Sequence, residues 1–461
     1  MTELQEDNNQ LFNATYIEDE QADRVVLKSA LGYVRSGKKK IKCQIVATLY
    51  YQPHPRIEFQ CVCAEVVVSA WSIMQNATQI KFMDAYFDVL VLSQVPDFDE
   101  SGRYCVTYVQ KTTAIVLGTD TTNVDELRLH IYNFERFFSH RFLFVKQGSS
   151  STRLDYVRLQ YKEFDIEMRH VLKSTEQTQK MKNSVGFGIT HLVKITHQTS
   201  KTFCPHDALR HTKALGLTLS FLRGSLNFVP LISGHKNGEL VYESWTVPLA
   251  RWHNDQNIFD VWTHPDGDTN YIEQLFPKFT QYIDALDDDS WQDYEFLHRV
   301  VVTYNQANTS IYIPNSIILV QVAFETIAYQ YIVERTKYVS KEGYTSLKYE
   351  ADKFRLLFGY LSISADVSTY STELAQKLSK SGKTKYDIPR LLTEMRNAYI
   401  HADNSQSKNN ALEGDDTLQY LQVLLYVLEL TILAVIGYDG YHRNRLRNTA
   451  PGTVERVPWA K

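Results

Sequence analysis

The sequence predicts a multidomain α+β protein in which a mainly antiparallel β domain precedes an all-helical bundle. From residue 24 to residue 135, short runs of β-branched and aromatic residues alternate with turn signals, a pattern typical of strands. After about residue 270, apolar residues recur with the 3.6-residue period of helices. With 461 residues the chain is too long for one ordinary core, so two or three domains are expected.

Two runs in the first part show the strand pattern most clearly, Cys43–Tyr51 and Gln60–Val68. Ser36–Lys40 lies between two strand-like runs and is expected to form an exposed hairpin turn. Alternation continues from Arg153 to His197, where His191 shares a strand face with Phe187, Ile189, Val193 and Ile195. We interpret His191 as a sheet histidine with satisfied hydrogen bonds and not as a ligand.

A helix is expected at His206–Leu222, after Pro205 and ending at Gly224, and strands are expected again at Leu226–Leu231 and Leu240–Val247. Residues 24–265 are therefore assigned to a β-rich sensing or regulatory domain with a sandwich or jelly-roll-like arrangement. The acidic residues 1–23 are expected to be disordered. The segment His264–Asp268 is the expected linker.

Residues 270–445 are assigned to a compact helical bundle with short connections. Its expected helices are Ile272–Leu286, Trp291–Gln306, Asn315–Tyr338, Leu347–Leu361, Thr372–Lys380, Ile388–Ala402 and Leu418–Ile436. Capping residues are expected at Asp289-Ser290 for the second helix, at Asn315-Ser316 for the third, and at Asp387 with Pro389 for the sixth. Residues 446–461 are expected to form a basic tail.

The last expected helix is almost continuously apolar and about as long as a membrane-spanning helix. Gln419, Gln422 and Glu429 interrupt it, Asp415–Thr417 offers an N-cap, and Gly437 offers a C-terminal stop. These features favour a central bundle helix over a membrane span, so no membrane partner is expected.

Charge and cysteine content exclude several classes of protein. With 49 basic and 53 acidic residues the formal net charge is −4, so any contact with nucleic acid must depend on a local basic patch. The five cysteines lack the paired spacing of a disulfide framework or a zinc site. The N-terminus carries no apolar core typical of a secretory signal. A cytoplasmic protein without a metal ion is therefore expected.

The sixth expected helix carries the residues with the clearest chemistry, Arg396, Asn397 and His401. On a helix Asn397 and His401 lie four positions apart on one face, and Arg396 lies one position further round. RNA cleavage without a metal needs proton transfer, which a histidine performs near neutral pH, and a guanidinium to hold the phosphate oxygens. Asn397 can orient His401 or contact the phosphate. Taken alone, the same residues also fit a surface arginine and a histidine near a helix C-terminus.

This pattern of Arg, Asn, three variable residues and His resembles the signature of the HEPN superfamily of ribonucleases. The segment Ile436–Tyr441 after the last helix further resembles the ApeA-type HEPN domains of bacterial antiviral proteins, which also carry a β-rich N-terminal domain. The resemblance covers about Asn315–Arg445 closely and the first 265 residues in architecture only. It implies a metal-independent endoribonuclease without a cofactor that leaves a 2′,3′-cyclic phosphate. Arg396 would clamp the phosphate, His401 would act as general acid and base, and Asn397 would orient the reacting groups.

The resemblance also implies partners. Two HEPN domains pair in the family so that both motifs line one cleft, which implies a homodimer acting on RNA. The biological role would be abortive infection in phage defence, with a phage protein as trigger at the β domain. An alternative is a non-catalytic HEPN module for dimerisation or RNA binding, joined to a ligand- or protein-binding β domain.

Four further positions are candidates for supporting roles. Glu325 lies among apolar residues on the third expected helix, where it can pair with Arg396 or simply occupy a solvated helix edge. Lys380, Lys383 and Lys385 precede the sixth helix and can steer an RNA backbone or form a solvated loop.

Overall fold

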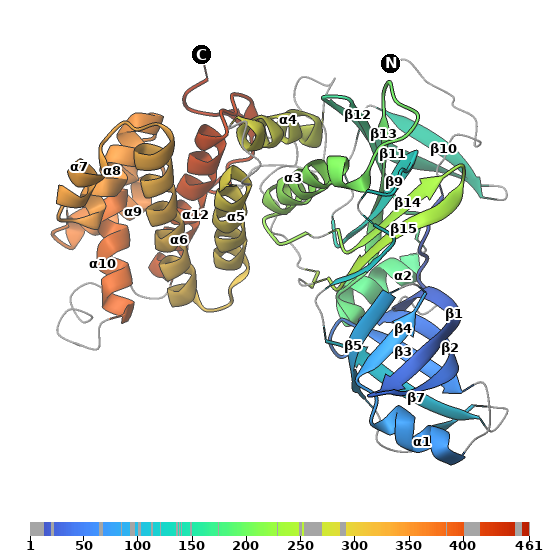
Figure 1. Cartoon of the computed structure of the whole chain (residues 1–461). Helices are drawn as coiled ribbons and strands as arrows, with labels where there is room; N and C mark the ends of the chain where they lie inside the picture. Colours follow the sequence, from blue (N-terminus) through green and yellow to red (C-terminus); the bar gives the residue numbers. More distant parts are fainter. Residues whose placement is uncertain are drawn as a thin grey trace. The chain divides into compact units, whose positions relative to one another are not determined.

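The computed structural model describes residues 13–19, 23–63, 68–83, 85–92, 97–99, 103–111, 114–119, 121–134, 137, 139, 141–147, 150–173, 175–227, 229–248, 251–252, 270–285, 292–383, 385–400, 415–447 and 454–460. The chain divides into two compact units (Figure 1). One comprises Met1–Gly216 with Asn227–Asn254 and is rich in strands; the other comprises Leu217–Leu226 with Asp255–Lys461 and is helical. A β-rich part followed by a helical part is therefore confirmed.

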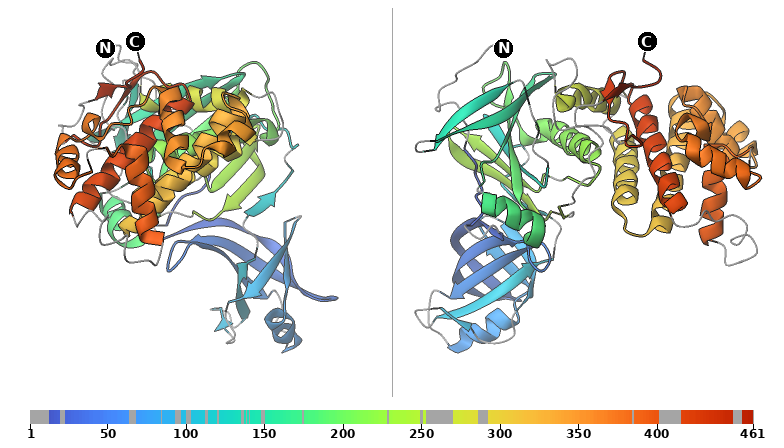
Figure 2. Two further views of the ribbon diagram at one scale, coloured as in Figure 1. Left: turned by 90° about the vertical axis from the view of Figure 1, so that its left-hand side faces the viewer. Right: turned by 180° about the vertical axis from the view of Figure 1, so that it is seen from behind.

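The first unit begins with a closed barrel. Its strands are β1 (Arg24–Ser36), β2 (Lys39–Tyr50), β3 (Arg56–Cys63), β4 (Gln79–Phe82), β5 (Ala85–Val91) and β7 (Tyr104–Gln110), with the short β6 (Asp97–Phe98) beside β7. All pairs are antiparallel, and pairing of β3 with β7 closes the ring. Helix α1 (Val68–Gln75) covers one end of the barrel, where Tyr108 donates a hydrogen bond to the carbonyl oxygen of Met74 at 2.7 Å (Figure 2).

The same unit contains an open antiparallel sheet of eight strands in the order β10-β11-β12-β13-β9-β14-β15-β8. The strands are β8 (Ala114–Leu117), β9 (Glu126–Tyr132), β10 (Phe142–Gln147), β11 (Ser150–Tyr161), β12 (Phe164–His170), β13 (Ile189–His197), β14 (Leu231–Lys236) and β15 (Glu239–Thr246). The unit also contains α2 (Thr175–Lys180), the π-helix η2 (Met181–Val185) and the first part of α3 (Pro205–Arg223), whose residues from Leu217 onward belong to the helical unit.

An ordered segment near the N-terminus, residues 13–19, lies against this unit through buried polar contacts. The Tyr16 hydroxyl donates to Glu243 at 2.8 Å and accepts from the Trp245 indole at 2.7 Å. Glu18 accepts from the Tyr51 hydroxyl at 3.0 Å and from the Ile189 amide at 2.7 Å. The prediction that residues 1–23 are disordered is therefore wrong for residues 13–19, because their few apolar and polar side chains find buried partners from distant strands.

The predicted sandwich is wrong, because the first strands form a closed barrel and the later ones a separate open sheet. Closure depends on the pairing of β3 with β7, and alternation within a strand carries no information on such a long-range pairing. Two strand ends are also wrong. Val68 begins helix α1 instead of ending a strand, and β14 begins only at Leu231, after Pro230, which lacks the amide donor that a sheet needs.

The hairpin at Ser36–Lys40, helix α3 and strand β15 are confirmed, and Gly224 ends α3 with φ of +69°. His191 is a buried sheet residue as predicted, but among the described residues neither of its ring nitrogens has a hydrogen-bond partner. Its ring instead packs against Phe134 and Phe137, each at 5.3 Å between centroids. The prediction of satisfied hydrogen bonds is thus wrong, and burial lowers the pKa of His191 well below its usual value.

In its described residues, the helical unit contains the seven expected helices and two short ones that were not predicted from the sequence. They are α4 (Tyr271–Asp284), α5 (Gln292–Thr309), α6 (Ile313–Ile327), α7 (Lys341–Ser346), α8 (Glu350–Leu361), the 3-10 helix η4 (Val367–Thr369), α9 (Thr372–Lys380), α10 (Ile388–Ile400) and α12 (Asp415–Val435). Helix α6 continues directly into a π-helix, η3 (Ala328–Arg335), so the expected third helix is one element with a change of period. The missed elements are α7 and η4.

Two of the predicted helix ends are confirmed and two are wrong. Asp387 caps α10, where its Oδ1 accepts from the Arg390 amide at 3.0 Å, and Gly437 ends α12 with φ of +68°. The cap predicted at Asn315-Ser316 is wrong, because α6 already begins at Ile313 and takes Pro314 into its first turn. Asp415–Thr417 lies inside the first turn of α12 instead of preceding it. Asp289-Ser290 and the expected linker lie outside the described residues.

Helix α12 is packed within the helical unit (Figure 1). Its Glu429 is fully buried and accepts a hydrogen bond from the Tyr304 hydroxyl at 2.7 Å. By length and composition alone, Ile313–Arg335 and Asp416–Val435 are apolar enough to cross a membrane, and 56% and 78% of their most apolar windows are buried inside the protein. A buried core helix passes the same test, so this is weak evidence for a membrane span.

The expected basic tail is not a loose extension in its described part, residues 454–460. Strand β17 (Glu455–Arg456) pairs with β16 (Tyr441–His442), and the Trp459 indole donates to the Tyr438 carbonyl oxygen at 2.7 Å. Arg445, just before this segment, forms an ion pair with the buried Glu429 at 2.8 Å. The described residues of the expected basic tail are thus paired with the residues that follow α12.

Candidate functional site

A cavity of about 1030 Å³ lies in the helical unit, between α6, η3, α7, α8 and α10. Arg396, Asn397 and Glu325 all line it. Three of the residues singled out from the sequence, from two helices 71 positions apart, thus share one concave surface. The rest of its wall comes from the start of α8 and the loop before it, including Lys348, Tyr349, Asp352 and Arg355.

Helix α10 presents one face to the core and another to this cavity. Its buried residues are Ile388, Leu391, Leu392 and Met395, with the helical spacing i, i+3, i+4, i+7. The cavity residues Arg390, Thr393, Glu394 and Asn397 follow the same spacing on another face, with Arg396 beside them. Apolar burial therefore fixes the rotation of α10, and this rotation places the polar residues at the cavity wall.

Arg396 has only one described hydrogen bond from its side chain, from a guanidinium nitrogen to Oδ1 of the adjacent Asn397 at 3.1 Å. Within the described part of the chain, no carboxylate lies within ion-pair distance of Arg396. The side chain is half-buried, so solvent screens it only in part. The guanidinium is therefore a charged fork with several donors available to a ligand in the cavity.

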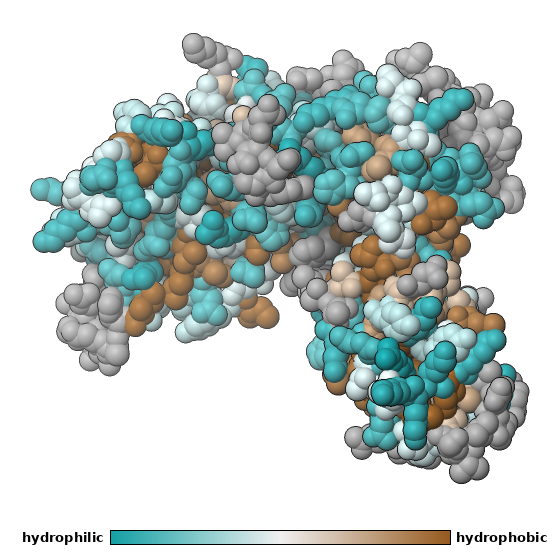
Figure 3. All heavy atoms as spheres, viewed as in Figure 1, coloured by the Kyte–Doolittle hydropathy of each residue, from teal (hydrophilic) through white to brown (hydrophobic). Residues whose placement is uncertain are grey.

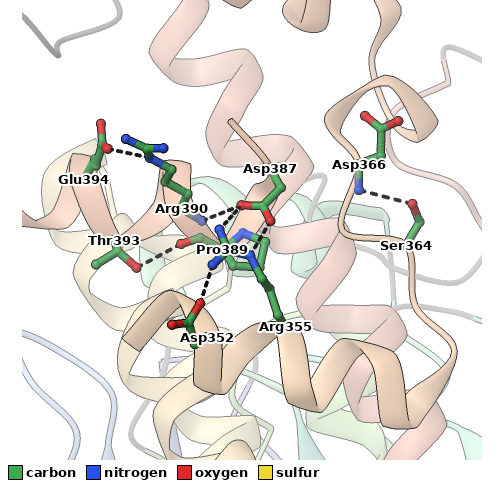
Figure 4. A network of polar contacts seen from close by, with 9 residues as sticks. All are labelled: Asp352, Arg355, Ser364, Asp366, Asp387, Pro389, Arg390, Thr393 and Glu394. Carbon is green, nitrogen blue, oxygen red and sulfur yellow. Dashed lines mark hydrogen bonds and ion pairs between the residues drawn. The ribbon is translucent and has the colours of Figure 1, made fainter. Parts of the chain in front are cut away.

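Two other arginines of the cavity are already paired with carboxylates, in contrast to Arg396. Arg355 donates to Asp387 at 2.6 and 2.9 Å and to Asp352 at 2.6 Å, and Arg390 donates to Glu394 at 2.9 Å (Figure 4). The hydrogen bond to Asp387 raises the pKa of the Arg355 guanidinium. The pair of Arg355 with Asp387 joins α8 to the start of α10, and the pair of Arg390 with Glu394 lies within α10, so both arginines have a structural role.

Glu325 does not form the ion pair with Arg396 that was one of its two expected roles. Its Oε1 accepts from the Gln321 amide at 2.7 Å on the same helix. Burial raises the pKa of Tyr344, and the carboxylates of Glu350 and Glu325 raise it further, so Tyr344 keeps its phenolic proton at neutral pH. Glu325 thus contributes negative charge at the α6 side of the cavity.

The three lysines predicted to steer RNA do not line the cavity. Lys380 and Lys385 are exposed, and Lys383 lies 5.5 Å from the ring centre of Tyr386. The same ring lies 4.4 Å from the guanidinium of Arg390, a cavity residue. Lys383 is therefore linked to the cavity edge through one aromatic side chain, whereas the other two lie on the surface outside it.

His401, the proposed proton-transfer residue, follows Ile400 in the sequence and lies outside the described residues. Sequence reading missed the wall formed by α7 and α8. Tyr344, Lys348, Tyr349 and Lys353 belong to it. The one available signal was the dense mixture of charged and aromatic residues at Lys348–Arg355, which does not by itself distinguish a solvated helix start from a cavity wall. Within the described residues, no cluster of three or more His, Cys, Asp or Glu side chains could hold a metal ion.

Comparison with known proteins relates both units to one group of sequences. Residues 288–455 match the family model described as the YopA C-terminal domain, and residues 119–256 match the one described as the YopA central domain. A protein of Bacillus subtilis (strain 168), described as "SPbeta prophage-derived uncharacterized protein YopA", is 29% identical over 350 residues, which cover 75% of this chain and 74% of that protein. No solved structure matches the chain. The match to the C-terminal domain model contains Arg396 and the other residues that line the cavity. Neither of the two matched ranges includes the barrel strands.

Proposed function

We propose that the helical unit is a HEPN-type, metal-independent endoribonuclease and that the cavity lined by Arg396 binds the scissile phosphate. The observation that carries this proposal is the state of Arg396: a guanidinium at a cavity wall, next to Asn397 and without a carboxylate partner among the described residues. Such a fork matches two phosphate oxygens. A purely structural arginine would be paired, as Arg355 and Arg390 are in the same cavity.

The proposed reaction needs one clamp and one proton carrier. His401 takes the proton of the ribose 2′-OH, the 2′-oxygen attacks the adjacent phosphorus, and the bond from phosphorus to the 5′-oxygen breaks. A proton passes to the 5′-oxygen, which leaves a 2′,3′-cyclic phosphate and a 5′-hydroxyl. Arg396 stabilises the added negative charge of the pentacoordinate phosphate, and Asn397 orients either the phosphate or His401. Two protomers that join their cavities would supply two such histidines.

We also propose that the chain is an abortive-infection effector of the cytoplasm whose β-rich unit receives the activating signal, a phage component. The similarity to a prophage-derived protein supports this setting, because a resident prophage gains when its host excludes a competing phage. It does not bear on the chemistry, which depends on the cavity alone.

RNA cleavage by purified protein in the presence of EDTA tests the nuclease. We expect Arg396→Ala to lower the cleavage rate by about 10²–10³-fold, because it removes donors aimed at the developing phosphate charge. His401→Ala should lower it by about 10²–10⁴-fold. The readout is the appearance of 2′,3′-cyclic phosphate ends on a labelled RNA.

A matched control is Arg299→Ala, since Arg299 is an exposed arginine on α5 outside the cavity wall. It should cleave like the parent chain. The nuclease proposal is wrong if the parent, Arg396→Ala and His401→Ala give equal RNA profiles and equal toxicity in cells, with and without phage infection. The alternative, in which the helical unit only dimerises or binds RNA, would then hold.

A further inference from the structure

One face of the barrel carries a row in which basic and aromatic side chains alternate across four neighbouring strands. Tyr33 on β1 lies opposite Lys42 on β2 and opposite Lys81 on β4, and Lys81 lies opposite Tyr86 on β5. These residues alternate along their strands with buried core residues such as Val34 and Ile80, so all four side chains point outward. With strands about 4.8 Å apart, the row is roughly 14 Å long.

The next row on the same face adds positive charge. Arg35 on β1 lies directly opposite Lys40 on β2. Like charges in directly opposed positions destabilise a sheet, and an anionic partner would relieve this cost. Lys38 and Lys39 follow at the tip of the same hairpin, whereas Asp88 on β5 is the one acidic residue at the far end of this row. The face is therefore strongly positive within a chain of net negative charge.

Of the two tyrosines in the first row, Tyr86 is exposed and Tyr33 is partly exposed, and each lies close to a lysine. Tyr86 is 57% exposed, and its ring centre lies 5.7 Å from the Lys81 ammonium; Lys40 lies 5.2 Å from the ring centre of Tyr33. Such exposed contacts of an ammonium with a ring are weak, so a nucleobase can replace them by stacking. Figure 3 shows hydrophilic and hydrophobic residues side by side on the face of the barrel that is turned to the viewer.

We propose that this basic-aromatic surface, formed by Tyr33, Arg35, Lys40, Lys42, Lys81 and Tyr86, binds single-stranded RNA. Cations neutralise phosphates, and aromatic rings stack on bases. Proteins that bind single-stranded nucleic acid without sequence preference combine these two contacts. The alternation within one row favours this partner over two others. A duplex hides the faces of its bases, and an acidic protein needs the cations but not the rings.

The proposal goes beyond the nuclease and does not depend on it. The surface lies in the β-rich unit, outside the cavity of Arg396, and it binds RNA whether or not the chain cleaves it. It gives the β-rich unit a role of its own, the capture of unpaired RNA.

Fluorescence anisotropy with a labelled, unstructured 20-nucleotide RNA tests this surface, using full-length Arg396→Ala protein so that cleavage cannot shorten the probe. Adding Lys40→Glu and Lys42→Glu should weaken binding at least tenfold and flatten the dependence of log K on log salt by about 0.7 per lost phosphate contact. Adding Tyr86→Ala should weaken binding about fivefold or more with an unchanged salt dependence. All variants must keep the circular dichroism of the parent.

Matched controls are Lys201→Glu with Lys236→Glu, two exposed lysines of the same unit, and Tyr338→Ala, an exposed tyrosine of the helical unit. Both should bind like the parent. Three results would overturn the proposal: unchanged affinity in the Lys40/Lys42 variant, equal affinity of the parent for duplex RNA, or binding to phosphatidylserine vesicles that is lost with Lys40 and Lys42 while RNA binding persists. If the surface variants lose RNA binding and the same substitutions leave cleavage unchanged in the parent, the nuclease proposal is unaffected. If the chain binds RNA through this surface but does not cleave it, the proposal for the surface is unaffected.

Discussion

At the scale of single residues, the helical unit contains a buried carboxylate that is held by two partners through one of its oxygens. Glu429 on α12 is 0% exposed, accepts from the Tyr304 hydroxyl at 2.7 Å and pairs with Arg445 at 2.8 Å. Arg445 also donates to the Asn308 side chain at 2.7 Å. This network connects the segment after α12 to α5. Glu429, which interrupts the apolar sequence of α12, therefore stabilises the packing of these elements.

Removing one member of this network should therefore be costly. We expect Glu429→Ala to lower the free energy of unfolding by about 3–5 kcal/mol, because it leaves the guanidinium of Arg445 buried without its counter-charge. Urea denaturation followed by circular dichroism measures the change. Replacing both partners, as Glu429→Leu with Arg445→Met, should cost clearly less than the single change, because no unpaired charge remains. A double variant less stable than Glu429→Ala would contradict this explanation.

At the scale of elements, α10 illustrates how local signals and packing combine. Asp387 caps its N-terminus and also pairs with Arg355 of α8, and the apolar stripe on the other side holds the helix against the core. One carboxylate thus fixes both the start of the helix and its position beside α8. Arg396 depends on both, because its place at the cavity wall follows from the rotation of α10.

The two roles of Asp387 can be separated. Asp387→Asn keeps an N-cap oxygen but loses the ion pair with the partly exposed Arg355, so we expect a loss below about 1 kcal/mol. Asp387→Ala loses both and should cost about 1–2 kcal/mol. Thermal and urea unfolding of the two variants, compared with the parent, distinguish them. If Asp387→Asn and Asp387→Ala lower the free energy of unfolding equally, the N-cap contributes nothing and the ion pair accounts for the whole loss.

At the scale of the whole molecule, buried histidines link stability to pH. Burial lowers the pKa of His442 and of His211 to about 4 and that of His130 to about 3, although their usual pKa is about 6.5. In the folded protein they stay neutral at mildly acidic pH, whereas the unfolded chain takes up protons there. Stability is therefore complete above about pH 6.5 and falls as the pH drops towards 4, by up to roughly 3 kcal/mol for each histidine.

Thermal unfolding from pH 7.5 to pH 4.5 tests this coupling. We expect the midpoint to fall steadily below pH 6.5 in the parent. His442→Gln, which removes one of the three groups while leaving a polar side chain beside Tyr426, should show a shallower fall. A midpoint that stays constant to pH 4.5, or a slope unchanged by the substitution, would show that these histidines are not neutral in the fold.

The sequence by itself determined the long helices of the helical unit and the polar face of α10, but not the short elements α7 and η4. The 3.6-residue period of the apolar residues located all seven long helices, and Asp387 and Gly437 marked two of their ends, because capping and backbone strain act over a few neighbouring residues. The hairpin at Ser36–Lys40 was predictable for the same reason.

Only the tertiary structure determined which of these elements pack against one another. The pairing of β3 with β7 makes a barrel of strands that fit a sandwich equally well. The pairings of β1 with β2 and β4, and of β4 with β5, bring Lys42, Tyr33, Lys81 and Tyr86 into one row. The fold of α8 against α10 surrounds Arg396 with a cavity and pairs its neighbouring arginines but not Arg396 itself. Such contacts join residues far apart in the chain, and their geometry depends on how whole elements pack, which the spacing of residues along one element does not specify.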